Sequence, residues 1–319
     1  TVSRVMNGTP TVAPELVARV RAAAEALNYE PSQVARSLAL GRTSTVSLIV
    51  PDLANPMFQD VLRGLSNAAG REGHRLIVAE SNENAEEEAI LAVEARRRSD
   101  GLVLASPRMP EAKLRDLAER LTPLVLLNRE LLGSTVPSLS VDYSAGMREI
   151  VNHLLQLGHR HLVYLSGPEA SSPNRDRLAV LRAAAAADPG FTLTELPCGA
   201  TFEDGHAAAE RVVRTGASAV VAYNDMVAFG TLSGLHELGV SVPGEISITG
   251  FDDIPFARYT TPPLTTASIP KNELGSQAWS RLWALMNGEP GGYNVRFQPR
   301  LIVRESTGPA PAGPPRSTR

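Results

Sequence analysis

The sequence predicts an α/β protein with two doubly wound parallel-sheet lobes. From Val46 onward, short apolar runs rich in β-branched residues alternate with helical patterns. Such runs are typical of parallel strands that helices cover on both faces. The same alternation repeats after Ser144 over a stretch of similar length, which predicts a second unit. An arginine-bearing helical segment precedes the alternation and indicates a separate, smaller all-α piece.

The first 30 residues contain one clear helical pattern. Pro14–Leu27 is rich in alanine and places its larger apolar side chains along one stripe, as in an amphipathic helix. Ala13 stands before Pro14, where a side-chain oxygen would normally cap the helix. Because alanine cannot accept that hydrogen bond, we expect a weak helix start.

A second, shorter helix is predicted between Ser32 and Leu40. Ser32 can cap it and Gly41 can end it. A helix of one or two turns is unstable alone in water. We therefore expect this segment to become ordered only when a partner holds it.

The first unit after this segment alternates regularly between strands and helices. Its predicted strands are Val46–Val50, Leu76–Ala79, Leu102–Ala105, Leu124–Leu127 and Leu139–Val141. Its predicted helices are Met57–Glu72, Glu83–Arg97 and Glu111–Leu121.

The second unit repeats the pattern. Its predicted helices are one that ends at Leu157, then Asn174–Ala187, Phe202–Thr215 and Asp225–Leu238. Its predicted strands are Leu162–Leu165, Leu193–Leu196, Val220–Tyr223 and Ile246–Phe251. A further helix, Leu274–Met286, and a short strand, Leu301–Val303, follow.

Composition limits the classes of function. The chain has 319 residues and a net charge of −3, so it is no general binder of polyanions. No apolar run approaches the roughly 20 residues of a membrane span, and no leader opens the chain, so we expect a cytoplasmic protein without a membrane partner. Cys198 is the single cysteine, which excludes an internal disulfide. Residues 1–44 carry five Arg and three Glu, a weak excess of positive charge.

Enzyme motifs are missing. The sequence lacks a Gly-x-Gly-x-x-Gly, a phosphate loop, a His-Glu-x-x-His and a Gly-x-Ser-x-Gly. His159 and His161 are two residues apart but have no further metal ligands nearby, so we interpret them as structural. The sequence therefore predicts a protein that is not an enzyme and has no cofactor or metal ion.

Polar residues gather at the carboxyl ends of the predicted strands, where open α/β sheets bind their ligands. They are Asn128, Arg129, Asn224, Asp225, Asp252 and Asp253, together with Arg177 at the start of a helix after Ser171. An Arg and an Asp that face one cleft can hydrogen-bond the hydroxyls of a sugar or similar metabolite. For each single residue the alternative is a helix cap. We favour the cap for Asp225 and ligand contact for Arg177 and Asp252.

Several motifs resemble the lactose-repressor/galactose-repressor (LacI/GalR) family of bacterial transcription regulators. Val34-Ala35-Arg36-Ser37-Leu38, Gly-Arg-Thr, Ile-Val-Pro-Asp and Asn-Pro-Met-Phe look like the hinge and first core strand of that family. Thr1 to Gly8 resembles the recognition helix of its helix-turn-helix, without the preceding helix and turn. The resemblance covers essentially the whole chain and implies a partial helix-turn-helix head before two periplasmic-binding-protein-like lobes.

The resemblance also implies DNA contacts. In the family, the recognition helix reads base edges in the major groove, which points to Thr1, Arg4 and Asn7. The hinge helix lies in the minor groove and inserts a leucine between base pairs, which points to Arg36 and Leu38. The alternatives are a solvated Arg4 and a Leu38 that packs at a domain edge.

The family's effector contacts fall on residues of the cleft. Arg177, Asp252 and Asn224 match its effector-binding Arg, Asp and Asn, and Phe58 stands where an aromatic ring often lies against a sugar. Phe58 could equally be a core residue. Asn128, Arg129 and Ser171 complete the predicted effector site. Val180-Leu181 and Ile269 depart from the family pattern, which leaves the identity of the effector open.

The family's topology implies three crossings between the lobes, near Asp142–Ala145, Ser268–Lys271 and Phe297–Pro299. The resulting units are a head (1–30), a hinge helix and linker (31–44), an N-terminal lobe (45–143 with 271–297), a C-terminal lobe (144–270 with 298–307) and a disordered tail (308–319). The tail is predicted because it has too little apolar surface to fold.

These observations predict a homodimeric repressor that binds a palindromic operator and is controlled by a small polar effector, a sugar. The helices at Met57–Glu72 and after Asp225 are the predicted exposed dimer faces. The alternative is a solute-binding protein of a sugar uptake system, which would have a signal peptide and no DNA-binding head.

Overall fold

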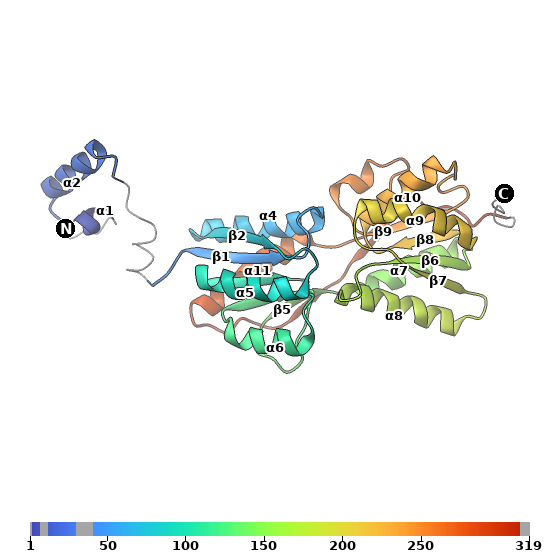
Figure 1. Ribbon diagram of the computed structural model, residues 1–319, viewed down its shortest axis with the longest axis horizontal. Coiled ribbons are helices and arrows are strands. Elements are labelled where there is room, and N and C mark those ends of the chain that lie inside the picture. The colour runs from blue at the N-terminus through green and yellow to red at the C-terminus, as the bar shows by residue number, and fades with distance from the viewer. Residues whose placement is uncertain (1, 7–11, 30–40, 313–319) are drawn as a thin grey trace.

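The computed structural model describes residues 2–6, 12–29 and 41–312 (Figure 1). Two helices, α1 (Val2–Met6) and α2 (Pro14–Ala26), form the N-terminal piece and contact each other. As expected, Ala13 makes no side-chain cap at the start of α2. Every helix of the described residues is too short or too polar to span a bilayer.

The N-terminal lobe is a six-stranded sheet in the order β11-β5-β4-β3-β1-β2, and its strands pair in parallel. Its strands are β1 (Thr45–Val50), β2 (Arg75–Glu80), β3 (Gly101–Ala105), β4 (Leu124–Leu127), β5 (Ser138–Val141) and β11 (Val295–Phe297). Its helices are α4 (Pro56–Arg71), α5 (Ala85–Arg98), α6 (Glu111–Arg120) and α11 (Lys271–Met286).

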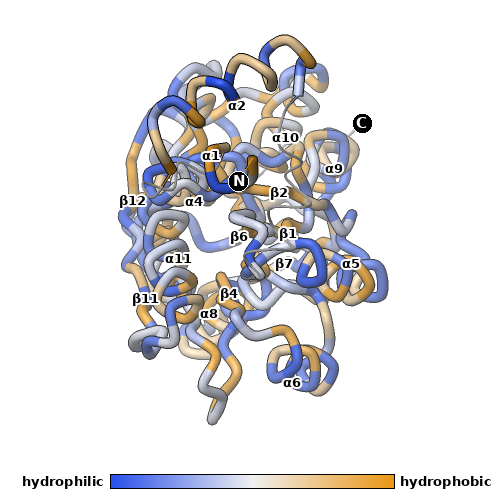
Figure 2. Tube along the Cα trace, turned by 90° about the vertical axis from the view of Figure 1, so that its left-hand side faces the viewer, coloured by the Kyte–Doolittle hydropathy of each residue, from blue (hydrophilic) through white to orange (hydrophobic). Residues whose placement is uncertain are grey.

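Helices cover both faces of this sheet. Figure 2 shows α4 and α11 on one side of the strands and α5 and α6 on the other. Successive β1 residues serve the two cores: Leu48 packs in the cluster that contains Leu65 of α4, and Ile49 in the cluster that contains Leu117 of α6. The period of two in strand side chains therefore gives one strand two buried faces, as its continuous apolar run predicts.

The C-terminal lobe repeats the arrangement with a six-stranded sheet in the order β12-β10-β9-β8-β6-β7. Its strands are β6 (His161–Ser166), β7 (Thr192–Pro197), β8 (Ala219–Ala222), β9 (Ser247–Asp252), β10 (Thr265–Ser268) and β12 (Arg300–Ile302). Its helices are α7 (Tyr143–Gln156), α8 (Ser172–Ala187), α9 (Phe202–Thr215), α10 (Asp225–Glu237) and the 3₁₀ turn η1 (Pro255–Arg258). Only β12 runs antiparallel to its neighbour, β10. The predicted fold class is confirmed.

Each lobe contains one tightly packed helix pair that depends on glycine. A Cβ on Gly64 of α4 would lie 2.2 Å from the carbonyl oxygen of Asn272 in α11, and a Cβ on Gly230 of α10 would lie 1.9 Å from that of Phe202 in α9. This packing buries most of α10 and leaves only its last turn and Ser233 exposed. The expectation that this helix is exposed is therefore wrong for most of its length, and its part in a dimer face stays a prediction.

Two strands, β10 and β11, were not predicted from the sequence. Thr265–Ser268 looks polar in sequence but is buried, because Thr266 Oγ1 donates to Asp225 Oδ1 at 2.6 Å and Thr265 Oγ1 bonds Thr307 Oγ1 at 3.0 Å. β11 is only three residues long. The chain changes lobes after β5, between β10 and α11, and between β11 and β12, which are the three predicted crossings. The residue limits of the lobes stay a prediction.

The predicted disordered tail begins too early. Gly308 N donates to Ser247 Oγ at 3.1 Å, Gly308 O bonds His159 Nε2 at 3.0 Å, and Ala310 N donates to Leu157 O at 2.8 Å. These backbone hydrogen bonds fix residues 308–310 to the C-terminal lobe although they bring little apolar surface. Residues 313–319 lie outside the described part of the chain.

Candidate functional site

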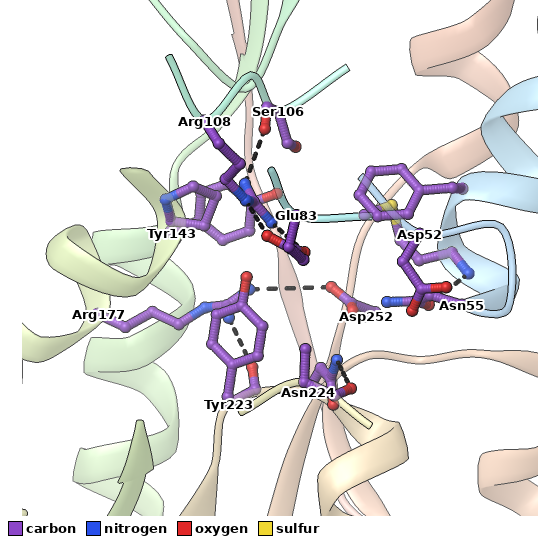
Figure 3. A pocket seen from close by; sticks show the side chains of 14 residues that line it. Asp52, Asn55, Glu83, Ser106, Arg108, Tyr143, Arg177, Tyr223, Asn224 and Asp252 are labelled. Carbon is purple, nitrogen blue, oxygen red and sulfur yellow. Dashed lines mark hydrogen bonds and ion pairs between the residues drawn. The ribbon is translucent and has the colours of Figure 1, made fainter. Parts of the chain in front are cut away.

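A narrow cleft lies between the lobes at the carboxyl ends of strands from both sheets (Figure 3). We call it the first cleft. The empty space between its walls, with the open mouth included, is about 390 Å³. It is lined by Asp52, Asn55, Met57, Phe58, Glu83, Ser106 and Arg108 from the N-terminal lobe, and by Tyr143, Pro173, Arg177, Ala200, Tyr223, Asn224 and Asp252 from the C-terminal lobe.

Arg177 of α8 is the central cation of the C-terminal wall. Its guanidinium carbon lies 4.0 Å from the ring centre of Phe251, 4.6 Å from that of Tyr143 and 4.9 Å from that of Tyr223. Its Nη1 donates to the backbone oxygen of Tyr223 at 2.5 Å, whereas its buried Nε has no hydrogen-bond partner. The aromatic rings hold the cation in place by cation–π attraction. The protein alone therefore leaves part of this side chain's hydrogen-bonding capacity unused.

Asp252, the last residue of β9, faces Arg177. Asp252 Oδ1 is 3.9 Å from Arg177 Nη2, too far for a hydrogen bond, so both groups can still bond a ligand hydroxyl. Burial raises the pKa of Asp252 to about 6, although Arg177 and Lys271 both favour its ionised form. Its φ of 104° is strained for a residue with a side chain, and such strain is often found at functional sites.

Lys271 keeps this turn in place. Its Nζ donates to the backbone oxygens of Asp252, at 2.5 Å, and Asp253, at 2.8 Å. Lys271 begins α11 of the N-terminal lobe, so its contacts tie the end of β9 to the opposite lobe.

The N-terminal wall has its own ion pair. Arg108 donates through Nε and Nη2 to the two carboxylate oxygens of Glu83, and through Nη1 to Ser106 O at 2.7 Å. Behind it, buried Glu88 accepts from the backbone N–H groups of Arg108 and Met109, each at 2.9 Å, and burial raises the pKa of Glu88 to about 7. All three guanidinium nitrogens of Arg108 are thus engaged.

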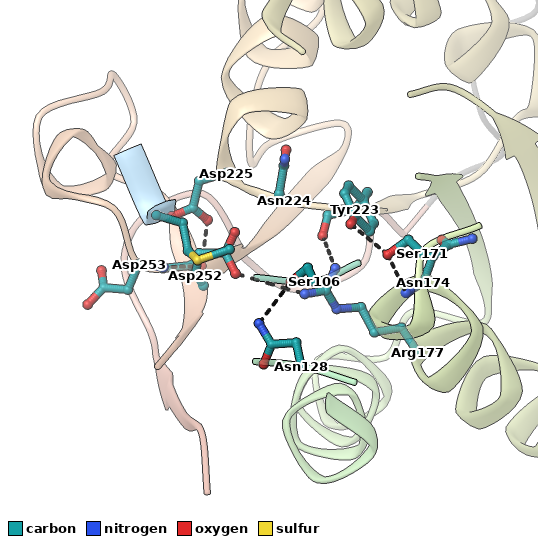
Figure 4. Close-up of polar contacts among 12 residues, drawn as sticks. Ser106, Asn128, Ser171, Asn174, Arg177, Tyr223, Asn224, Asp225, Asp252 and Asp253 are labelled. Atoms are coloured by element: carbon teal, nitrogen blue, oxygen red, sulfur yellow. Dashed lines mark hydrogen bonds and ion pairs between the residues drawn. The ribbon is translucent and has the colours of Figure 1, made fainter. Parts of the chain in front are cut away.

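Asn224, and not Asp225, takes the helix-cap role that was predicted for Asp225. Asn224 is the N-cap of α10, since its Oδ1 accepts from Val227 N at 2.9 Å, and it also lines the first cleft. Asp225 is not the cap that we predicted: its carboxylate accepts from Ile254 N at 2.8 Å and from Thr266 Oγ1. Asp225 therefore joins the loop after β9 to β10 (Figure 4).

Ser171 lies behind the first cleft and does not line it. Its Oγ caps α8 by accepting from Asn174 N at 3.3 Å and bonds the hydroxyl of Tyr223 at 3.0 Å (Figure 4). Tyr223 in turn accepts from Arg177. This geometry indicates that Ser171 positions the Arg177 wall from behind.

Asn128 and Arg129 line a second cleft between the lobes, whose empty space, with the open mouth included, is about 960 Å³. Tyr143 lines both clefts. Asn128 Nδ2 donates to Ser106 Oγ at 3.1 Å, while its buried Oδ1 has no partner. Phe58 is a buried core residue that also lines the first cleft, and its contact with an effector stays a prediction.

Sequence reasoning missed several lining residues, notably Asp52, Glu83, Arg108, Tyr143 and Tyr223. Asp52 and Arg108 come shortly after predicted strands, so the rule that found Asn128 and Asp252 could have found them. Glu83 was assigned to a helix, whereas α5 begins at Ala85 and Glu83 has a φ of 59°.

The remaining predicted residues make no cluster with this site. His159 bonds Ser218 and Gly308 while His161 bonds Thr194, which agrees with structural roles. In residues 2–6, 12–29 and 41–312, no group of three His, Cys, Asp or Glu could hold a metal ion. Arg4 is exposed on α1. Thr1, Asn7, Arg36 and Leu38 lie outside the described residues.

Two stretches of the chain match known protein families. Residues 1–32 match the family described as bacterial regulatory proteins, lacI family, and residues 151–307 match the periplasmic binding protein-like domain. The HTH-type transcriptional regulator GalR of Escherichia coli (strain K12) is 33% identical over 317 residues, covering 96% of this chain and 91% of that protein.

Two solved structures are similar in fold and sequence. The lac repressor dimer bound to operator and the anti-inducer ONPF has a TM-score of 0.84 at 25% identity, covering 96% of this chain and 94% of that chain. A LacI family transcriptional regulator from Enterococcus faecium with bound ribose has a TM-score of 0.71 at 27% identity, covering 83% and 99%.

Proposed function

The chain belongs to the lacI family of bacterial regulatory proteins, and we propose that it is a cytoplasmic transcriptional repressor whose DNA affinity is set by a carbohydrate in the first cleft. The observation that carries the effector part is the separation of buried Arg177 and Asp252. Their 3.9 Å gap leaves a cationic donor and an anionic acceptor side by side. A sugar hydroxyl both donates and accepts, so one hydroxyl can bond both groups.

The aromatic surroundings support a sugar in particular. Phe58 and Tyr143 line the first cleft together with Asn55 and Asn224, so apolar ring surface alternates with amide groups. Sugars offer C–H faces and hydroxyl edges to such walls. Ribose in the Enterococcus faecium regulator is consistent with this chemistry.

For the DNA side, we propose that α1 contacts the major groove through Arg4 with Thr1 and Asn7, and that Arg36 and Leu38 enter the minor groove. Arg4 is exposed and available for such a contact. The operator-bound lac repressor dimer supports a two-fold complex on a palindromic site. On α4, polar residues such as Gln59, Arg63 and Asn67 form the exposed stripe that could contact a second copy.

The rival functions fit less well. A solute-binding protein would not need the segment that matches the regulatory family at residues 1–32. The relatives are regulators, and we further propose that this chain catalyses no reaction, because the polar groups of the first cleft are ion pairs and caps without a nucleophile–base pair.

Measurements of sugar binding and of DNA binding by the purified protein test the function. Mass spectrometry identifies small molecules that the protein retains, and calorimetry with pentoses and hexoses measures affinity. Selection from random duplexes followed by anisotropy then measures DNA binding with and without the sugar. We expect a palindromic sequence whose affinity changes when the sugar is added. A protein that binds sugar tightly but selects no DNA sequence would support the solute-binding alternative instead.

A further inference from the structure

The second cleft combines cationic groups from both lobes. Arg129, in the loop between β4 and β5, belongs to the N-terminal lobe, and Arg175, in the first turn of α8, belongs to the C-terminal lobe. Both line the cleft. A ligand held by these two side chains would therefore bridge the lobes.

Arg129 is an unusual buried cation. It is 9% exposed, yet within the described part of the chain its guanidinium has no hydrogen bond and no ion pair. Burial lowers the pKa of Arg129, and the neighbouring positive charge of Arg175 lowers it further. Among the described residues, Arg175 itself donates only to the backbone oxygens of Glu169 and Ala170. In the described part of the chain no protein group hydrogen-bonds the largely buried Arg129 side chain, so it keeps its capacity to bind an anion.

The carboxylates of the second cleft do not fill that role. Glu130 pairs with Arg296 at 3.1 Å and accepts from Ser140, Glu111 pairs with Arg115 at 2.8 Å, and Asp142 caps α7 by accepting from Ala145 N. Asp176, next to Arg175, has no such contact among the described residues, and burial raises its pKa. Asp176 would therefore oppose an incoming anion, and its neutral form would oppose it less.

The first turn of α8 adds a favourable field. Ser172, the first residue of this 16-residue helix, lines the second cleft. The N-terminal end of a helix carries partial positive charge that favours anions. We propose that the second cleft is an anion site in which Arg129 and Arg175, from opposite lobes, bind one carboxylate or phosphate group. This site is distinct from the carbohydrate contacts of Arg177 and Asp252, and the proposal does not depend on them.

Calorimetric titration of the full chain with inorganic phosphate, at an ionic strength held constant with sodium chloride, tests the site. We expect saturable binding that weakens at least about 10-fold in Arg129→Gln and in Arg175→Gln, because each variant loses a charged hydrogen bond. Asp176→Asn should bind phosphate several-fold more tightly. Arg98→Gln, which removes an exposed arginine of α5, is the matched control and should bind like the parent.

Phosphate affinity should fall in the two Arg→Gln variants and rise in Asp176→Asn. These opposite changes separate a binding role of the side chains from a structural one. Arg175 is exposed, so Arg175→Gln keeps the test valid even if Arg129→Gln fails to fold. No saturable phosphate binding by the parent, or equal binding by the parent and all three cleft variants, overturns the proposal. Phosphate binding that Asp252→Asn changes but Arg175→Gln does not would place the anion in the first cleft and also overturn it.

The source of the anionic group follows from two further titrations. Gluconate carries a carboxylate on a polyol, and glucose is neutral. If gluconate binds more tightly than phosphate and loses affinity in both Arg175→Gln and Asp252→Asn, the anion is part of a ligand that spans both clefts. If gluconate binds no more tightly than phosphate, the site takes a free anion. Tight glucose binding that depends on Arg175 overturns an anion-selective site.

Discussion

The two walls of the first cleft each carry a buried arginine, but the two arginines are used differently. Arg108 in the N-terminal wall forms a bidentate pair with Glu83, and all its nitrogens are engaged. Arg177 in the C-terminal wall has an unpaired Nε and stands 3.9 Å from Asp252. A satisfied pair stabilises its own lobe, whereas an unsatisfied one retains capacity for a ligand. The same residue type is thus fully engaged on one wall and keeps unused hydrogen-bonding capacity on the other.

The largest effect is expected when the ion pair between Arg108 and Glu83 is broken. Arg108→Met should lower the free energy of unfolding of the N-terminal lobe by about 3 kcal/mol, since removing one partner of a buried pair leaves the other uncompensated. Glu83 is partly exposed and can hydrate, which limits the loss. Both tryptophans, Trp279 and Trp283, lie on α11 of this lobe, so tryptophan fluorescence during urea denaturation reports on it directly.

The double variant Arg108→Met/Glu83→Gln is the control for this prediction. It removes the stranded carboxylate and should regain part of the lost stability. A fluorescence midpoint that does not move in Arg108→Met would mean that the pair contributes nothing to the lobe.

The second prediction concerns the unsatisfied pair. Arg177→Ala and Asp252→Asn should each weaken binding of the identified sugar by about 10- to 150-fold, because each loses a charged hydrogen bond of about 1.5–3 kcal/mol. Calorimetry measures the affinity. The tryptophan-monitored transition of the opposite lobe should stay where it is, which distinguishes lost contact from general unfolding. Unchanged affinity in both variants would place the sugar elsewhere.

The sequence predicts a residue of such a site only when a recognisable local pattern places that residue in the fold. Asp252 and Asn224 follow recognisable apolar strands, so their place at the sheet edge could be inferred. Whether every nitrogen of Arg177 has a hydrogen-bond partner could not be inferred. The aromatic rings around its guanidinium come from Tyr143, Tyr223 and Phe251, which are far apart in the chain.

The same limit explains the errors. The burial of Thr265–Ser268 depends on hydrogen bonds to Asp225 of α10 and to Thr307, and the fixed segment at Gly308 depends on single hydrogen bonds to distant residues. Local periodicity predicts that an element exists. It does not report which long-range hydrogen bonds make a polar segment part of the core.

The third prediction is a pH dependence of sugar affinity. Asp252 has its pKa raised to about 6 by burial, so it is ionised at pH 7.5 and mostly protonated at pH 5. If the carboxylate accepts a sugar hydroxyl, affinity should fall about 10-fold between pH 7.5 and pH 5, since the ligand must compete with the proton. Calorimetry at both pH values measures this. Asp252→Asn should flatten the profile; an equally steep profile in that variant would assign the titration to another group.

The smallest expected effect comes from Ser171, which supports the Arg177 wall from behind. Ser171→Ala removes the cap of α8 and the hydrogen bond to the Tyr223 hydroxyl, so the C-terminal lobe should lose about 1 kcal/mol of stability. Because Tyr223 O accepts from Arg177 Nη1, the cation should also be held less firmly, and sugar affinity should fall a few-fold at most. Far-UV circular dichroism during urea denaturation gives the stability, and calorimetry gives the affinity. Tyr223→Phe is the matched control: it removes the same hydroxyl bond but keeps the cap, so it should reproduce the affinity change with a smaller stability loss. A loss of affinity in Ser171→Ala as large as that in Arg177→Ala would instead show that the serine contacts the sugar itself.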